Sequence, residues 1–526
     1  MSRSAKKDKI DLLTTDLHYR VLVGEAVLRF SYTKDLLLED EPARDRGKPF
    51  PLGNVSAWLS GLEARIIEKE RVAVQGSLAG RAFFYGEAGI KELTWQEAEI
   101  YSEAALPGAL PGMETTAYGR ISFLGQEGAP LEAEDKLLYR LQIEVEVFVA
   151  AVDPQQLKVA VGVKDLPPEK VSRALLNVEE LAFEEVLDFS LTQEEDFAED
   201  LNFIRIINSY LHGFDYEWGP EEIIFKGELV TSIYVMAGGE GRIQEKRQQF
   251  NRQLPFPAQK KGLQVSFFPG IKEAACVAAE KKANYETTVE VFCRATFVSQ
   301  QEVVTDLEGL DVKKEYLLLP KTIGTAREPL ELVQKLAVPF PRETAAGFCC
   351  LQDLLVNVQE DRINVSGALE KDVYYLPVVE REFGDEEEVA EAGLPFVLKV
   401  NDEFMSDFYL PGVSPDAAAV AYFQPQGTEF APTENDTLQI SHALLEVRAW
   451  EMQEVAVVIP QRVPPGTSMV IYAVRQGDTL LKIGRAYGLR PQTIAAANDL
   501  AEDDALESGQ RLLLPLLFGD SFVAPE

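Results

Sequence analysis

The chain has 526 residues, of which 46% are hydrophobic and 26% are charged, a balance typical of a folded protein that divides into three to five domains. Lys and Arg together number 51 and Asp and Glu number 86, so the formal net charge is −35. A surface this negative repels phosphate backbones and anionic headgroups, which excludes nucleic acid as an expected partner.

The sequence carries no recognisable signal for export or membrane insertion. The amino terminus is basic but lacks the apolar stretch of a signal peptide, and no run of apolar residues is long enough to span a membrane. Four cysteines, Cys276, Cys293, Cys349 and Cys350, are too few for a disulfide framework. The adjacent Cys349 and Cys350 could bind a soft metal or form a redox pair, but burial as small hydrophobic residues is favoured. We therefore expect a cytoplasmic protein with no metal site and no cofactor.

One pattern of residues occurs three times along the chain. It reads apolar-x-apolar-x-Gly-x-Leu, with an aromatic residue seven positions after the glycine. Alternating apolar residues predict a strand with one buried face, and a central glycine fits a bulge or a close backbone approach. The glycines lie about 150 and 140 residues apart, so the repeated unit has the size of a domain. The copies are Val72–Leu78 with Gly76 and Phe83, Ile223–Leu229 with Gly227 and Tyr234, and Ile363–Leu369 with Gly367 and Tyr374.

Each copy is followed by a Pro-Gly turn and by a second strand of the same kind. The predicted turns are 107–113, 268–271 and 410–413, and the predicted strands are 141–148, 285–292 and 438–447. Strands at short spacing, separated by such turns, predict antiparallel sheets packed into a sandwich or an open barrel. We therefore predict a mainly β fold with three repeated antiparallel β-sandwich-like modules.

The regions around these copies differ in character. Residues 166–212 are rich in Glu, Leu and Asp, which predicts a helical connector that becomes strand-like from Phe203. The acidic run Asp385–Glu388 could bind calcium, but it lacks the ligand spacing of a calcium loop, so a solvated loop is favoured. The prolines of 460–467 predict a short, stiff linker. The predicted units are 1–160 with the first module, 161–300 with the connector and second module, 301–459 with the third module, the linker 460–467, a C-terminal domain 468–518 and a tail 519–526.

The C-terminal domain begins with a predicted strand and helix. The strand Tyr472–Val474 leads into a turn at Gly477 and Asp478. Asp478 is suited to cap a helix that has Leu480, Ile483 and Tyr487 on one face. Gly488 can end this helix in a left-handed conformation.

A second predicted helix and strand complete this domain. The helix runs from about Pro491, a residue favoured at helix starts, to Asn498. Gly509 and Gln510 then turn into a last strand, Leu512–Leu514, which Pro515 closes. The predicted order of elements is therefore β-α-α-β.

This order and its motifs resemble the LysM domain. The shared motifs are Tyr-x-Val-x-x-Gly-Asp-Thr-Leu and Gly-Gln-x-Leu-x-x-Pro, with an Asn near the end of the second helix. Gly484 departs from the family, which usually has Ala there, and should loosen the first helix by roughly 1 kcal/mol.

The resemblance implies a binding groove. LysM domains commonly bind N-acetylglucosamine polymers, such as peptidoglycan, between the turn after the first strand and the loop after the second helix. Two alternatives stay open: Asp478 and Asn498 could serve only as a cap and a helix stop, and the groove could contact a protein, which the apolar Leu481 at its rim favours. The implied groove residues are Gly477, Asp478, Thr479, Leu480, Leu481, Asn498, Asp499 and Leu500.

The three repeats resemble SPOCS domains, whose pattern includes a closing Val-Glu-Val-Phe strand. Val145–Phe148 and Val289–Phe292 match this element, whereas Leu445–Arg448 departs from it. The first copy also has Tyr118–Arg120 where the other two have Pro-Gly. SPOCS modules followed by one LysM domain resemble the clostridial spore-coat morphogenetic proteins that bind the coat-scaffold ATPase. The resemblance implies a protein of the mother-cell cytoplasm that is recruited to the forespore surface.

Sequence motifs give no support for an enzyme. The histidines His18, His212 and His442 lie in different parts of the chain, and no metalloprotease, hydrolase-elbow or P-loop motif is present. Two non-enzymatic functions remain. In the first, the chain is an adaptor of endospore-coat assembly whose LysM domain docks on a coat scaffold protein. In the second, it is a self-assembling subunit of a filament or sheath on the spore or cell surface, with a LysM anchor for glycan.

Overall fold

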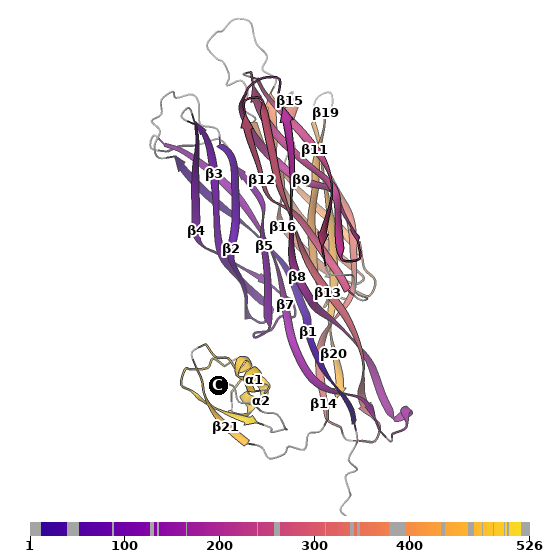
Figure 1. Ribbon diagram of the computed structural model, residues 1–526. Coiled ribbons are helices and arrows are strands. Elements are labelled where there is room, and N and C mark those ends of the chain that lie inside the picture. The colour runs from indigo at the N-terminus through magenta and orange to yellow at the C-terminus, as the bar shows by residue number, and fades with distance from the viewer. Residues whose placement is uncertain are drawn as a thin grey trace, which may run out of the picture.

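The protein is mainly β in a computed structural model, as the sequence predicts, and the chain forms several antiparallel sheets (Figure 1). Among the described residues, no helix is both long and apolar enough to cross a membrane. The described residues are 12–38, 52–86, 89–126, 131–133, 136–164, 166–238, 240–256, 263–310, 312–336, 341–344, 348–377, 396–432, 437–460, 468–475, 477–487, 489–498, 500–501 and 504–516.

The first segment, residues 12–163, forms two layers of strands. Strand β1 pairs antiparallel with β7 over almost its whole length, and β5 pairs with the other edge of β7. Strands β2, β3 and β4 form a separate sheet with β3 in the centre. The strands are β1 Leu12–Leu38, β2 Leu52–Glu68, β3 Arg71–Gly86, β4 Gly89–Ala105, β5 Glu114–Gln126, β6 Leu131–Ala133 and β7 Lys136–Val163.

The second segment, residues 171–307, pairs its strands in the same way. Strand β8 pairs with β13, β12 pairs with the other edge of β13, and β9, β10 and β11 form a sheet with β10 in the centre. A single pair, Val21 with Glu180, joins β1 to β8. The elements are a 3-10 helix at Pro168–Lys170, β8 Val171–Asp196, β9 Leu201–Trp218, β10 Glu222–Ala237, β11 Glu240–Pro255, β12 Leu263–Ala279 and β13 Lys282–Leu307.

The third segment, residues 314–458, again pairs its first strand with its last. Strand β14 pairs with β20, β19 pairs with the other edge of β20, and β17 lies between β16 and β18. Gly76, Gly227 and Gly367 thus all lie in central strands, namely β3, β10 and β17. The strands are β14 Lys314–Leu336, β15 Pro341–Thr344, β16 Phe348–Gln359, β17 Arg362–Pro377, β18 Phe396–Tyr409, β19 Ala418–Pro432 and β20 Thr437–Val458.

Each segment encloses a hydrophobic core between its two layers. Val74, Phe225 and Val365, from the three central strands, are buried in three separate cores. The layers also approach at their edges, since β2 lies against β5, β9 against β12 and β16 against β19. Each fully buried aliphatic or aromatic side chain stabilises the fold by about 1.5–3 kcal/mol relative to an exposed one.

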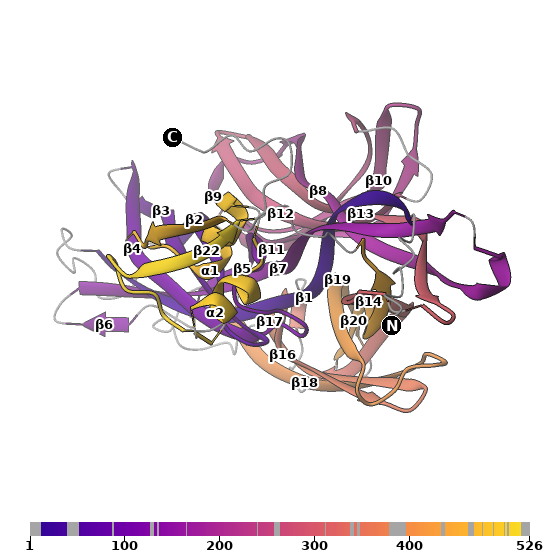
Figure 2. The ribbon, with the colours of Figure 1, turned by 90° about the horizontal axis from the view of Figure 1, so that it is seen from below.

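The three segments, which together we call the body (residues 12–460), meet at a shared junction. Figure 2 shows their strands arranged around a common centre. Phe148, Phe292, Tyr422 and Trp450 come from all three segments and are buried in one aromatic cluster there. The rings of Phe148 and Phe292 are 5.4 Å apart between centroids. Such contacts add to the burial of the rings, so the junction holds the segments together as one unit.

The helical connector predicted for residues 166–212 is wrong. Only the 3-10 helix lies there, and the rest forms β8 and the start of β9. In β8, Leu176 and Val178 face a core while Asn177 is exposed, which is the alternation of a strand. Pairing with β13, about a hundred residues further along the chain, outweighs the helical propensity of Glu and Leu.

One of the three predicted turns is also wrong. The chain does turn after Leu106 and after Leu410, but Pro269 and Gly270 lie inside strand β12. Strand β12 ends its sheet, so a proline there costs no pairing on the open edge. The acidic run Asp385–Glu388, most of the linker and the side chains of Cys349 and Cys350 lie outside the described residues.

The C-terminal domain has the predicted β-α-α-β order. Strand β21 pairs antiparallel with β22, and the two helices cover one face of this hairpin. Val474, Leu480, Ile483, Ile494 and Leu514 form a core that belongs to this domain alone. Its elements are β21 Ser468–Ala473, α1 Leu480–Tyr487, α2 Pro491–Ala497 and β22 Arg511–Leu516.

Candidate binding site in the C-terminal domain

The turn before α1 is held by the side chain of Asp478. Asp478 accepts hydrogen bonds from the backbone N–H of Arg475 at 2.8 Å and from the hydroxyl of Tyr472 at 2.7 Å. The Arg475 N–H and the Tyr472 hydroxyl hold the pKa of Asp478 below its ordinary value. Gly477 has φ +84°, a conformation that favours glycine. Asp478 thus closes the turn between β21 and α1.

The predicted helix cap is misplaced by one residue. Helix α1 begins at Leu480, so Thr479 and not Asp478 is the N-cap. The hydroxyl of Thr479 accepts a hydrogen bond from the backbone N–H of Lys482 at 3.2 Å, as an N-cap does. Lys482, which the sequence analysis did not single out, donates from its ammonium to the carbonyl of Gly477 at 2.8 Å.

Asn498 is committed to the fold of the domain. Its amide nitrogen donates to the carbonyls of Ile494 at 2.7 Å and Leu513 at 2.8 Å, and its amide oxygen accepts from the N–H of Leu513 at 2.6 Å. These bonds join the end of α2 to strand β22. The side chain of Asn498 is therefore a structural link, which agrees with the helix-stop alternative.

The eight predicted groove residues do not all reach the surface. Leu480 is buried in the core, whereas Gly477 and Thr479 are exposed. Leu481 and Leu500 are half-buried, and Asp499 lies outside the described residues. The accessible part of the predicted groove is therefore the Gly477–Thr479 turn with Lys482 beside it.

Gly484 has a packing role that helix propensity does not predict. A Cβ atom at this position would lie 2.4 Å from the carbonyl oxygen of Leu489, and the glycine is buried. The N–H of Leu489 donates to the carbonyl of Gly484 at 2.7 Å, which draws the chain after α1 against the helix. The expected cost in helix propensity stays a prediction, and the structure adds to it a packing reason for glycine at this position.

The outer face of the hairpin carries an exposed apolar pair. Ile471 and Leu513 are directly paired across β21 and β22, and they are 64% and 38% exposed. This face points away from the helices, so the domain offers a second surface besides the predicted groove. The sequence alternation in both strands could have revealed it.

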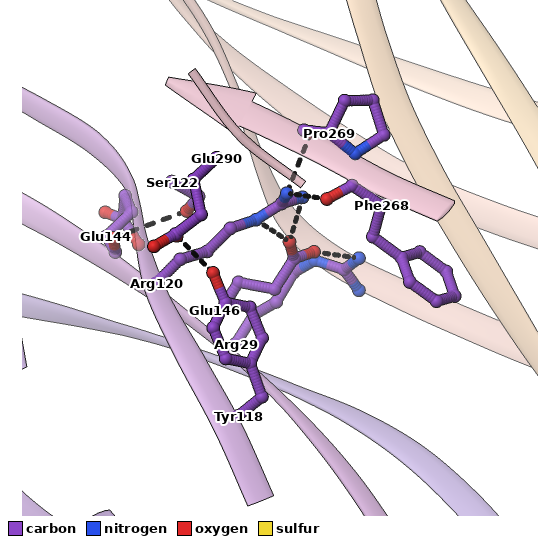
Figure 3. A network of polar contacts seen from close by, with 9 residues as sticks. All are labelled: Arg29, Tyr118, Arg120, Ser122, Glu144, Glu146, Phe268, Pro269 and Glu290. Carbon is purple, nitrogen blue, oxygen red and sulfur yellow. Dashed lines mark hydrogen bonds and ion pairs between the residues drawn. The ribbon is translucent and has the colours of Figure 1, made fainter. Parts of the chain in front are cut away.

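A network of polar contacts lies at the junction of the body (Figure 3). Arg29 and Arg120 each donate to the carboxylate of Glu146 at 2.6 Å. Arg120 also donates to the carbonyls of Phe268 at 3.1 Å and Pro269 at 2.8 Å, which ties the first segment to the second. Burial alone would raise the pKa of Glu146, but the two guanidinium groups hold it below its ordinary value.

A second buried network joins all three segments. Glu25 of the first segment pairs with Arg294 of the second at 2.8 Å and with Arg448 of the third. Arg294 also pairs with Glu184 at 2.6 Å, and Arg448 with Glu179 at 2.5 Å. Burial would raise the pKa of Glu25, but Arg448 and Arg294 hold it below its ordinary value. These charges are matched with one another, as buried charges must be.

A cavity of about 220 Å³ lies beside the Glu146 network, and residues of all three segments line it. Five charged groups in its wall are engaged with one another, since Arg29 and Arg120 pair with Glu146, and Arg327 lies 3.9 Å from Glu446. Among the residues that the structure describes, no group of three or more His, Cys, Asp and Glu side chains is placed to hold a metal ion.

Burial raises the pKa of Cys276 to about 12, so this thiol stays protonated and behaves as a small hydrophobic group.

Comparison with known proteins identifies one part of the chain. The LysM domain family matches residues 472–515, which covers the C-terminal domain from Tyr472 to Pro515. No curated protein and no solved structure matches the chain. The domain whose geometry is described above is therefore a LysM domain, which suggests binding to peptidoglycan or a related glycan.

Proposed function

We propose that the chain is a non-enzymatic assembly protein in which a rigid body carries one LysM binding domain. The LysM domain has its own core, and residues 461–467 connect it to the body. The body, in contrast, shares buried aromatic and charged groups among its three segments. The separate core of the LysM domain, together with the buried contacts that the three segments share, is the observation that carries the proposal.

We further propose that the three segments are copies of one module of the SPOCS type. The common pairing scheme and the central glycines support this reading. The turns add a detailed match: Leu106 donates to the carbonyl of Glu70 at 2.9 Å, and Leu410 donates to the carbonyl of Asp361 at 2.9 Å. Both acceptors have positive φ, at +56° and +55°. A positive φ is uncommon outside glycine, so its recurrence at the same place in two segments supports a common module.

The ligand that the LysM family suggests is a glycan that contains N-acetylglucosamine. The exposed Gly477–Thr479 turn and Lys482 offer backbone and side-chain hydrogen-bonding groups, and the half-buried Leu481 offers an apolar wall. A shallow site that combines a few polar groups with apolar surface suits an acetylated sugar.

The test is a titration of chitin oligomers into the isolated LysM domain (468–518) and into the body (1–460). We expect saturable binding to the LysM domain and none to the body. Binding to the body alone would overturn the assignment of ligand binding to the LysM domain.

A finer proposal follows from the SPOCS resemblance: the chain acts in endospore-coat assembly in the mother cell, and its LysM domain docks on a coat scaffold protein such as the coat ATPase. The exposed pair of Ile471 and Leu513 supports a protein contact, because interface cores favour apolar anchors. An Ile471→Asp change should weaken capture of the ATPase by on the order of 1–3 kcal/mol while the fold and glycan binding persist. Unchanged capture would exclude the hairpin face.

Self-assembly is a second candidate function, favoured by exposed apolar residues on unpaired strand edges. Strands β4 and β18 end their sheets, and they carry Tyr101 and Met405 at 60% and 78% exposure. Open edges of this kind can pair with another chain. Negative-stain imaging of the purified protein would separate the two functions: long regular fibres support the filament, and discrete particles support the adaptor.

A further inference from the structure

The LysM domain contacts the body through its first helix. Gly112, in the turn between β4 and β5, lies against Leu481, so that a Cβ atom at Gly112 would be 2.9 Å from Cδ2 of Leu481. Gly112 has φ +97°, a conformation that favours glycine, and its lack of a side chain leaves room for Leu481. Leu481 is one wall of the predicted groove, and the body therefore covers part of that wall.

A charged contact lies at the second helix. Arg490, the N-cap of α2, pairs with Glu315 near the start of β14. The side chain of Glu315 is 16% exposed, and partial burial lowers the pKa of Arg490. Figure 1 shows the LysM domain beside the lower end of the body, with both helices on the side nearer to the body. The exposed hairpin face with Ile471 lies away from this contact.

Because the linker is short, the LysM domain can stay docked on the body even though the contact between them is weak. Only residues 461–467 separate Pro460 at the end of the body from β21. A short linker of this kind holds the domain at an effective concentration in the millimolar range. One apolar contact and one ion pair, too weak to join two separate molecules, can then populate a docked state.

We propose that the turn with Gly112, together with Glu315, is a seat for the LysM domain of the same chain. A ligand that contacts the wall formed by Leu481 competes with this seat. The docked domain therefore binds its ligand more weakly than the free domain. This inference rests on the proposed binding function of the LysM domain, but the docking itself can be measured without any ligand.

The first experiment measures docking by small-angle X-ray scattering of the full chain. Glu315→Arg and Arg490→Glu should each enlarge the radius of gyration, because like charges then face each other. The double variant should restore the wild-type value. Glu328→Arg, an exposed change on the same strand, is the control and should have no effect. Equal radii for all variants, or no restoration in the double variant, would overturn the seat.

The second experiment measures competition by titration with chitin oligomers. The isolated LysM domain and full-length Glu315→Arg should bind about threefold to tenfold more tightly than the wild-type chain, since they are free of the docking equilibrium. Equal affinity for all three would contradict competition. If the isolated domain binds no oligomer, the proposed glycan ligand fails, while the scattering result still decides whether the seat exists.

Discussion

The body and the LysM domain reach stability by different routes. In the LysM domain, which has about fifty residues, strand, turn and helix residues close a small core by contacts near in sequence. In the body, Glu25 contacts Arg294 and Arg448 across 269 and 423 residues of sequence. We therefore expect the LysM domain to fold without the body, and we expect the three segments of the body to depend on one another at the junction.

The largest expected effect is at the centre of the junction. Arg294→Ala would leave the buried Glu25 with Arg448 alone and the partly buried Glu184 without this partner, which should destabilise the body by about 3–5 kcal/mol. Arg173→Ala removes an exposed pair with Glu302 and should cost about 0–1 kcal/mol. Chemical denaturation of residues 1–460 measures both. Similar values for the two variants would contradict a dominant role for the junction.

Acid should weaken the body. Arginine partners hold the pKa of Glu25 and of Glu146 below the ordinary value, so these carboxylates stabilise the fold at neutral pH. The contribution is present above the unfolded pKa of Glu, about 4.3, and is lost as the pH falls through the lower folded pKa. The melting temperature of residues 1–460 should therefore fall steeply below about pH 4.5. A melting temperature that does not change between pH 6 and pH 3 would be inconsistent with these networks.

Gly484→Ala separates packing from helix propensity in the LysM domain. Propensity alone predicts a gain of about 1 kcal/mol, because Ala is the better helix former. The close carbonyl of Leu489 predicts instead a loss of about 1–3 kcal/mol, since the new methyl group must displace backbone. Thermal unfolding of the isolated domain gives the sign, and a stabilised variant would refute the packing role.

The smallest effect is expected at the helix cap. Thr479→Ala removes the hydroxyl that accepts from Lys482 and should cost about 1 kcal/mol in the isolated domain. Thr493→Ala, at an exposed position inside α2, is the matched control and should be neutral or slightly stabilising. If both changes had the same effect, Thr479 would not be the cap.

The fold of the LysM domain was easier to predict from the sequence than that of the body, because its contacts are closer in sequence. The LysM elements lie close to their predicted residues, because turn, cap and proline signals act locally. In the body, the central strands with Gly76, Gly227 and Gly367 were found from their alternation. Their long partners β1, β8 and β14 were missed, because each pairs with a strand more than a hundred residues away.

The candidate site was predicted only in part, for a related physical reason. The motif located the Gly477–Thr479 turn. It could not show that the side chain of Asn498 forms hydrogen bonds with the backbone of Leu513. Nor could it show that Leu481 contacts Gly112. The ionic network was equally hidden, because 86 acidic residues give no indication of which few are buried. Contacts between distant residues decide these roles, and one sequence does not reveal them.

Calorimetry tests most directly whether a rigid body carries a separate binding domain. The measurement compares the full chain with residues 1–460 and with residues 468–518. The full chain should show two transitions. One should be a single cooperative transition of the body, present also in residues 1–460. The other should lie close to that of the isolated LysM domain. Three separate body transitions, or an isolated LysM domain without a cooperative transition, would contradict the account.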